Sequence, residues 1–204
     1  MNSCCIEIVA VAFERFGELK VFVQSILNQT RDNWKLHVIH DGPNQEFEQI
    51  MQDFCRQAPE QISFSSSERR YNDYGHSLRE IGLRDVTGDY ILITNADNYY
   101  VPKFLEFILG VIEQGDVDVV MYDMVHSHHN PGGRDAPSYS YFKTDYSHSN
   151  IDMGAAVIKR ELAQTAGFPD KSFAGDATYF SRVLAIKGAA TQGVKINRVL
   201  LVHN

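Results

Sequence analysis

Polar residues stand directly after a short apolar run near the middle of the chain. Residues Tyr90 to Thr94 have the character of a buried strand, and the segment from Asn95 to Asn98 follows, with Asp97 as its carboxylate. A carboxylate at the end of a buried parallel strand lies where backbone amides and helix N-termini converge, which suits a divalent cation that bridges phosphate oxygens. The same residues could instead cap a helix that begins near Pro102, and spacing alone favours the cap.

Other candidate residues also follow apolar runs or glycines. Asp41 opens an Asp-Gly-Pro turn after a strand-like run, and Asp176 follows Gly175 ahead of a helical pattern. A turn-fixing role for Asp41 and an N-cap role for Asp176 are the simplest interpretations. Clustered histidines at positions 126, 128 and 129 could bind a transition metal, although histidines in a loop are more often solvated.

The elements that must position these residues alternate in the first half of the chain. Strand-like runs are expected at residues 5–13, 34–42, 61–67 and 89–94, and amphipathic helices lie between them. This rhythm predicts right-handed βαβ crossovers, and therefore an α/β fold with one open, mostly parallel sheet and helices on both faces. Such sheets bind ligands beyond the carboxyl ends of their strands, where Phe13, Asp41 and the residues after Thr94 would lie.

The second half is less regular. A helix is expected from Phe104 to Ile112, a strand over residues 116–125, a strand and short helix over 151–170, a helix over 175–188 and a closing strand over 194–204. Residues 126–150 are rich in turn formers, so we expect a long, flexible loop there. The whole chain, residues 1–204, is expected to form one domain with halves at 1–100 and 101–204.

Composition excludes several classes of protein. With 204 residues, 44% of them hydrophobic, the chain can bury a sizeable core. Its formal net charge of −7 and lack of a basic segment argue against nucleic-acid binding. No apolar run is long enough to span a bilayer, and the N-terminus lacks a secretory signal, so we expect a cytoplasmic protein, with peripheral attachment to the inner membrane face left open. The three cysteines suit reduced thiols rather than disulfides or a zinc site.

Several segments recur in the order found in one known family. The chain contains "SILNQT" at residues 25–30, "HDGP" at 40–43, "GHSLREIGLRDVTGDYI" at 75–91 and Asn-Ala-Asp at 95–97, where the family has a DxD motif. On these segments the chain resembles the family 2 inverting glycosyltransferases with the GT-A fold, across nearly its whole length. The resemblance implies a nucleotide-sugar donor held by the first half, an acceptor held by the second, and a role in cell-surface polysaccharide biosynthesis.

The resemblance also implies roles for individual residues on the donor side. Phe13 and Glu14 would contact the base, and Asp41 would accept a hydrogen bond from a ring N–H such as that of uracil, so we expect a UDP-sugar. Arg79 would lie near the base and diphosphate. Asn95 and Ala96 would contact the donor, with the Asn95 amide in place of the usual first acid of the motif.

Metal binding and catalysis are implied in the same way. Asp97 would bind Mn²⁺ or Mg²⁺, and His203 after the closing strand would complete the coordination. Asp176, in "FAGDATYFSRV", would be the catalytic base of a single displacement. The acceptor would be a glycan or a lipid-linked sugar, and a homodimer is left open.

Two other functions compete with this interpretation. A GT-A module that binds nucleotide or glycan with little or no turnover would account for Asn95 and for Gly175, where many family members carry Glu before the catalytic Asp. A nucleotidyltransferase would need a glycine-rich, basic phosphate loop after the first strand, and residues 12–20 carry only one glycine. A measurement of donor turnover distinguishes an active enzyme from the binding module.

Overall fold

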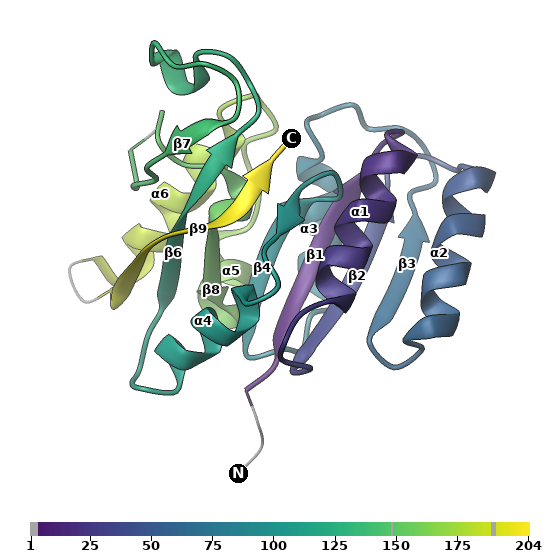
Figure 1. Ribbon diagram of the computed structural model, residues 1–204, viewed down its shortest axis with the longest axis horizontal. Helices are drawn as coiled ribbons and strands as arrows, with labels where there is room; N and C mark the ends of the chain where they lie inside the picture. Colours follow the sequence, from purple (N-terminus) through teal and green to yellow (C-terminus); the bar gives the residue numbers. More distant parts are fainter. Residues whose placement is uncertain (1–3, 148, 189–190) are drawn as a thin grey trace.

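One mixed sheet runs through the whole molecule. The computed structural model describes residues 4–147, 149–188 and 191–204, and within them nine strands join in the order β3-β2-β1-β4-β8-β6-β9-β5, with β7 paired to β6. In Figure 1 the strands β1, β2, β6 and β9 all point towards the upper edge, where the C-terminus also lies. Both halves of the chain therefore contribute to one edge of the sheet.

The first half has the parallel arrangement that its alternation predicts. Its strands are β1 (Ile6–Ala12), β2 (Trp34–His40), β3 (Ile62–Ser66) and β4 (Tyr90–Asn95). Strand β1 is central and pairs in parallel with β2 and β4, with Ala12 opposite His40 and Val11 opposite Asn95. Because parallel strands end at the same edge, the residues after β1, β2 and β4 are brought together there.

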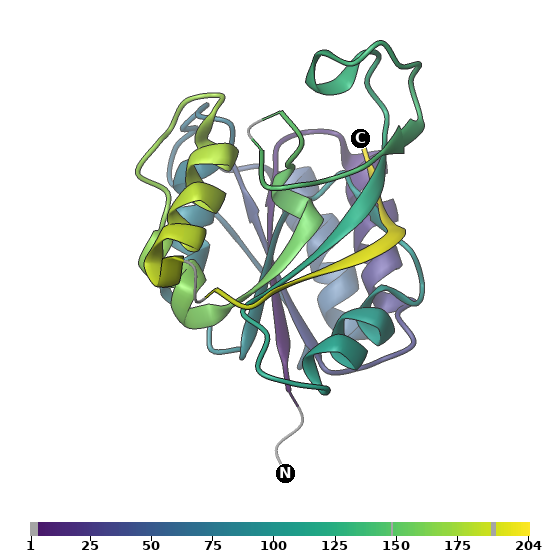
Figure 2. The ribbon, with the colours of Figure 1, turned by 90° about the vertical axis from the view of Figure 1, so that its left-hand side faces the viewer.

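Helices cover both faces, as expected. One apolar face of the sheet packs against α1 (Phe16–Leu27), α2 (Gln45–Gln57) and α4 (Phe104–Ile112), and the other against α3 (His76–Arg84), α5 (Arg160–Ala166) and α6 (Gly175–Lys187). The two layers are seen edge-on in Figure 2. Along β1, Ile6, Ile8 and Ala10 face the first core and Val9 and Val11 the second, following the two-residue period of a strand.

Close packing of α3 on the sheet depends on a glycine. A Cβ at Gly82 would overlap the Val9 side chain of β1. The absence of a side chain there allows α3 to lie directly on β1. This packing carries Arg79, one turn earlier in the helix, to the edge of the sheet where β4 ends.

The second half mixes strand directions. Its strands are β5 (Tyr99–Tyr100), β6 (Val119–His126), β7 (Ser140–Phe142), β8 (Ala156–Lys159) and β9 (Gly193–His203). Strand β8 lies antiparallel between β4 and β6, whereas β6 and β9 are parallel and end together at His126 and His203. The end of the chain is thereby returned to the edge where β1 and β4 end.

Residues 126–150 differ from the expected loop. Residues 140–142 form β7, which extends the sheet antiparallel to β6. The fully buried Asp123 holds this segment, since its carboxylate accepts hydrogen bonds from Tyr141 Oη (2.7 Å), the Thr144 amide (3.0 Å) and Lys195 Nζ (2.5 Å). The strand was not predicted because its three residues are too short for a periodic signal and its anchor lies on another strand.

Among the described residues, no helix combines the length and the apolar character that crossing a bilayer would require.

Candidate active site

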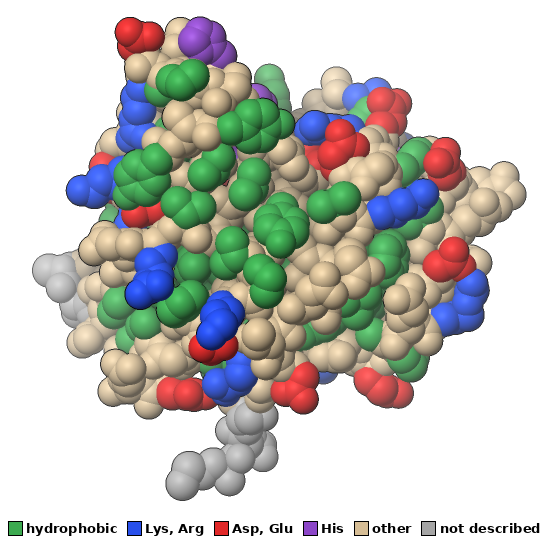
Figure 3. Space-filling view, viewed as in Figure 1, with side chains coloured by type: hydrophobic (Ala, Val, Ile, Leu, Met, Phe, Trp, Pro, Cys, Tyr) green, Lys and Arg blue, Asp and Glu red, His purple; other side chains and the backbone are tan. Residues whose placement is uncertain are grey.

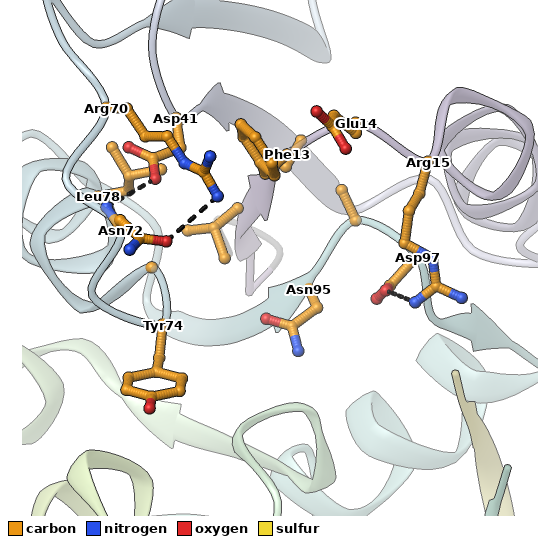
Figure 4. A pocket seen from close by; sticks show the side chains of 14 residues that line it. Phe13, Glu14, Arg15, Asp41, Arg70, Asn72, Tyr74, Leu78, Asn95 and Asp97 are labelled. Carbon is orange, nitrogen blue, oxygen red and sulfur yellow. Dashed lines mark hydrogen bonds and ion pairs between the residues drawn. The ribbon is translucent and has the colours of Figure 1, made fainter. Parts of the chain in front are cut away.

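A cavity of about 360 Å³ opens at the carboxyl ends of β1 and β4, and we call it the Phe13 cavity. Its lining includes six of the predicted site residues: Phe13, Glu14, Asp41, Asn95, Ala96 and Asp97. Figure 4 shows Asp41 and Asp97 at opposite sides, with Phe13 and Asn95 between them. The predicted donor-side residues are thus gathered around one space, with the exception of Arg79.

The backbone around this cavity is unusual. Four lining residues other than glycine, Glu14, Arg15, Asn72 and Tyr74, have positive φ angles of 51° to 60°. Such conformations cost of order 1–3 kcal/mol each and persist only where surrounding contacts fix them. Strain gathered in this way is typical of binding and catalytic loops, and it supports the assignment of the cavity as a functional site.

Asp41 fixes the loop that forms one wall of the Phe13 cavity. Its two carboxylate oxygens accept hydrogen bonds from the amides of Tyr71 (2.7 Å) and Asn72 (3.1 Å), rather than from the turn that follows Asp41. A carboxylate has about four lone-pair sites, so Asp41 keeps capacity to accept from a ligand.

Phe13 carries a cation on its ring. The guanidinium of Arg70 lies 3.7 Å from the ring centroid of Phe13 and hydrogen-bonds Asn72 (3.1 Å). A flat aromatic ring with a planar guanidinium over it forms a surface on which another planar group can stack. Sequence reasoning missed Arg70, because residues 67–75 carry no periodic or motif signal that points towards the strand ends.

Asp97 lies at the opposite side of the cavity and does not act as a helix cap. Helix α4 begins after Lys103 without a side-chain cap. Asp97 Oδ2 pairs with Arg15 Nη1 (2.5 Å), while Oδ1 is buried and has no hydrogen-bond partner among the described residues. Burial raises the pKa of Asp97, against the opposing effects of Arg15 and His203. The unpartnered oxygen leaves this carboxylate able to take a cation.

Arg79 connects two parts of the site from outside the Phe13 cavity. Its buried guanidinium donates to Asn95 Oδ1 (2.6 Å) and to the Tyr74 carbonyl (2.9 Å), and it lies 3.5 Å from Asp176 Oδ1. His76 Nδ1 is a further partner at 2.9 Å. The side chain therefore sets the position of Asn95 and compensates the charge of Asp176.

Removal of the Arg79 guanidinium should destabilise the protein strongly. We expect Arg79→Met to lower the free energy of unfolding by about 3 kcal/mol, because it leaves Asp176 without its cation and several buried acceptors without a donor. Urea denaturation measures this. Arg84→Met, on the exposed side of the same helix, is the matched control and should change stability by less than about 0.5 kcal/mol. Equal effects of the two variants would contradict the bridging role.

A second cavity of about 450 Å³, which we call the Asp176 cavity, adjoins the first. Asn95 and Tyr74 line both, and the second is also lined by Arg79, Asp176 and His203. Asp176 lies in the first turn of α6 but caps nothing, and its Oδ1 has no hydrogen-bond partner among the described residues. Burial raises the pKa of Asp176, although Arg79 works to lower it.

Asp152 also lines this cavity, although no pattern in the sequence pointed to it. Its Oδ2 pairs with His203 Nε2 (3.3 Å), and its Oδ1 accepts from the Gly154 amide (2.8 Å). Burial works to raise the pKa of Asp152, but His203 and the Gly154 amide bring it down to about 2. Asp152 was missed because it precedes a short 3₁₀ turn, and only the sheet brings it beside the end of β9.

His203 lies beside Asp97 through the last residue of the chain. The Asn204 side chain donates to the Asp97 carbonyl (2.7 Å), and the Asn204 amide donates to Asn98 Oδ1 (3.3 Å). Burial works to lower the pKa of His203, but Asp152, Asp97 and Asp176 together raise it. His203 Nδ1 is buried without a hydrogen-bond partner in the described part of the chain.

Comparison with known proteins gives the decisive observation. A model of the family described as glycosyl transferase family 2 matches residues 7–172. The chain belongs to this family. A glycosyltransferase of Rickettsia bellii described as uncharacterised is 23% identical over 116 residues, which cover 57% of this chain and 16% of that protein. The family 2 chain thus spans about a sixth of the length of that curated relative.

Solved structures show that this family 2 chain has the GT-A glycosyltransferase fold. S. aureus TarS 1–349 superposes with a TM-score of 0.78 at 15% identity, covering 98% of this chain and 60% of that one. The same protein in complex with UDP-GlcNAc gives 0.78 at 14%, covering 97% and 58%. The mannosyltransferase PcManGT of Pyrobaculum calidifontis, in complex with GDP-Man and Mn²⁺, gives 0.73 at 16%, covering 97% and 56%.

Proposed function

We propose that the protein transfers a sugar from a nucleotide-sugar donor, a UDP-sugar, to a hydroxyl of an acceptor, with inversion at the anomeric carbon. One observation carries this proposal. Two cavities meet at Asn95 and Tyr74, one edged by the Asp97 carboxylate and the other by the Asp176 carboxylate. Within the described residues, each carboxylate keeps one oxygen that accepts no hydrogen bond. A displacement reaction needs this arrangement of two reactants on either side of one carbon.

The Phe13 cavity suits the nucleotide. The stacked Phe13 and Arg70 offer a surface for a base, and Asp41 has capacity to accept a ring N–H. Uracil provides such an N–H, and the TarS structures in complex with UDP and with UDP-GlcNAc agree with this choice. PcManGT binds GDP-Man, so guanine is the second candidate for the base.

Asp97, at the other side of this cavity, and His203, which lines the Asp176 cavity, fit a divalent cation. Asp97 Oδ1 and His203 Nδ1 are both buried and unpartnered among the described residues, and an oxygen and an imidazole nitrogen together suit Mn²⁺. Asp97 would hold the ion with His203, and Arg15 would release one carboxylate oxygen. When bound, the ion supplies positive charge that stabilises a leaving diphosphate. Asn95 keeps its amide for hydrogen bonding to the donor.

Asp176 is the residue best placed to act as base. Two carboxylates lie in its cavity. Both oxygens of Asp152 have close partners, whereas Asp176 Oδ1 accepts no hydrogen bond among the described residues and faces the Arg79 guanidinium at 3.5 Å. Its raised pKa makes it a stronger proton acceptor once ionised. Asp176 would take the proton of the acceptor hydroxyl as that oxygen forms the new bond to the anomeric carbon and the diphosphate leaves with the old bonding pair.

The acceptor proposed for this site is a glycan or a lipid-linked sugar. The exposed side chains of Tyr74 and Phe173 line the mouth of the Asp176 cavity, with ring centroids 5.8 Å apart. Aromatic faces are apolar bodies against which the C–H face of a sugar ring can pack.

Loss of one of these rings should weaken acceptor binding. We expect Phe173→Ala to raise the KM for the acceptor roughly fivefold or more, which corresponds to about 1 kcal/mol, with the donor KM and stability unchanged because the ring is 81% exposed. Steady-state kinetics with each substrate varied in turn measure this. Ile186→Ala removes another exposed apolar side chain, near the far end of α6, and should leave both constants unchanged. A change in the donor KM alone would contradict the placement of the acceptor.

A screen of nucleotide sugars tests the proposed function. With Mn²⁺ present, at least one UDP- or GDP-sugar should raise the thermal midpoint and release nucleoside diphosphate on incubation. A donor that binds but is never turned over with any acceptor, even as hydrolysis, would favour a binding module.

A further inference from the structure

Three histidines converge at the ends of the two parallel strands β6 and β9. His126 and His203 lie opposite each other in the strand register, and His128 follows β6 by two residues. One ligand atom from each of the three side chains lies within 4.8 Å of the other two. Figure 3 shows histidine side chains at the upper end of the face that carries β6 and β9. The cluster joins His126 and His128 to His203, a contact that no sequence pattern predicts.

We propose that His126, His128 and His203 form a binding site for a transition metal ion of the Zn²⁺ class, separate from the ion that Asp97 would hold. His–Zn bonds are about 2.0–2.1 Å long, so shifts of about 1 Å would bring three such nitrogens around one ion. Three imidazoles leave a fourth position for water or for an anionic group in the cavity. Imidazole ligands favour Zn²⁺, Ni²⁺ and Cu²⁺ over Mg²⁺ and Ca²⁺, which prefer oxygen.

His203 has the surroundings of a metal ligand. Its Nε2 faces the Asp152 carboxylate at 3.3 Å, while its Nδ1 is buried and unpartnered in the described part of the chain. Histidines that bind metals commonly donate their second ring N–H to a carboxylate in this way, which fixes the tautomer and orients the free nitrogen. The side chain is 9% exposed, so an unpartnered nitrogen there is costly unless it binds something.

The other two histidines pack against His203, and His126 Nδ1 also accepts a hydrogen bond from the His128 amide (3.1 Å). The His126 and His203 rings stack with centroids 4.3 Å apart, and His128 packs edge-on against both, at 4.9 Å and 5.4 Å. The His128 side chain is exposed and free to adjust.

Because His203 is common to both sites, the two ions would compete for it. An ion held by the three histidines would also fix residues 126–128 beside Asp152 and Asp176 in the acceptor-side cavity.

Calorimetric titration of Zn²⁺ into metal-free protein without a polyhistidine tag tests the proposal. We expect one Zn²⁺ per chain, and an affinity at least about tenfold weaker in His128→Gln, since loss of even an outer-shell partner costs about 10- to 100-fold. The matched control is His129→Gln, because His129 is the next histidine along the chain and its ring bonds the Ala136 carbonyl instead. That variant should bind Zn²⁺ as the wild type does.

Asp97→Asn distinguishes the three-histidine site from the cation site proposed at Asp97. That variant should keep its Zn²⁺ affinity, and Co²⁺ in place of Zn²⁺ should give the visible absorption of a four-coordinate nitrogen-rich site that His128→Gln loses. Absence of Zn²⁺ binding, unchanged affinity in His128→Gln, equal loss in His129→Gln, or loss in Asp97→Asn would each overturn the proposal. These readouts need no donor, so they stand apart from the test of transfer.

Discussion

Replacement of Asp176 by Asn should abolish transfer while leaving the donor site intact. We expect turnover to fall roughly 10²- to 10⁴-fold, the range that a positioned general base contributes, with the affinity for nucleotide within a factor of two of the wild type. Asp176 lines the second cavity only, so its loss does not disturb the walls of the Phe13 cavity. Product formation measured with calorimetric nucleotide binding tests both parts.

The same substitution should make the protein more stable near neutral pH. Burial raises the pKa of Asp176 above its ordinary value of 3.8, so the folded state holds its proton more tightly than the unfolded state. Stability from this group is therefore lost as pH rises from 3.8 through the folded pKa, and the ionised carboxylate is a net cost at pH 7. Asp176→Asn removes this cost, so its advantage over the wild type should be present at pH 7 and shrink towards pH 4.

Asp170 is a nearby carboxylate whose pKa is shifted in the opposite direction, so it serves as a control. Asp170 accepts from Thr178 Oγ1 (2.7 Å) and the Ser172 amide (2.9 Å), and these hydrogen bonds lower its pKa to about 2. Its contribution to stability is present above pH 3.8 and lost as pH falls towards 2. Asp170→Asn should therefore destabilise the protein at pH 7 and leave transfer nearly unchanged. If Asp176→Asn instead destabilised the protein and kept its activity, Asp176 would be a structural residue.

Replacement of Asp97 by Asn should remove the response to Mn²⁺. A bound cation supplies several kcal/mol of charge stabilisation in a transition state, so transfer should fall at least about 10²-fold. The structure gives Asp97 one unpartnered oxygen and one shared with Arg15. Asn95→Asp, which restores the first acid of the family motif, should tighten Mn²⁺ binding. Titration of Mn²⁺ in the presence of UDP measures both variants.

Asn95→Asp should also lower turnover, and the contact between Asn95 and Arg79 explains why. Asn95 Oδ1 accepts from Arg79 Nη2, so an aspartate there would draw the Arg79 charge away from Asp176. Asn95→Asp should therefore lower turnover at saturating Mn²⁺ while tightening the metal. Unchanged Mn²⁺ affinity in both Asp97→Asn and Asn95→Asp would show that the ion lies elsewhere.

The donor-side half of the site could be predicted from the sequence because local pattern determines it. The apolar composition of β1, β2 and β4 predicts that they are buried strands. Parallel pairing of these strands then brings Phe13, Asp41 and Asp97 to one edge of the sheet. Asp97 and Asp176, for which helix capping was the simpler interpretation, do not cap helices in the structure. The family resemblance is confirmed by a model that matches residues 7–172, whereas the role that it implies for Asp176, outside that range, stays a prediction.

Other residues of the site could not be predicted, since long-range contacts place them. Arg70 lies over Phe13 from a loop whose next two amides, those of residues 71 and 72, donate to Asp41. Asp152 meets His203 because an antiparallel strand, β8, was inserted between β4 and β6. Arg79, which the resemblance places near the base and diphosphate, is held between Asn95 and Asp176, and its contact with a donor stays a prediction.

The central claim is that the Phe13 cavity binds the nucleotide of a sugar donor together with a cation. Calorimetric titration of UDP and of GDP, each with and without Mn²⁺, tests this most directly. We predict one nucleotide per chain, UDP preferred, with affinity that depends on Mn²⁺ and falls in Phe13→Ala. If neither nucleotide binds in the presence of Mn²⁺, or if binding is unchanged in Phe13→Ala and Asp97→Asn, the claim is contradicted.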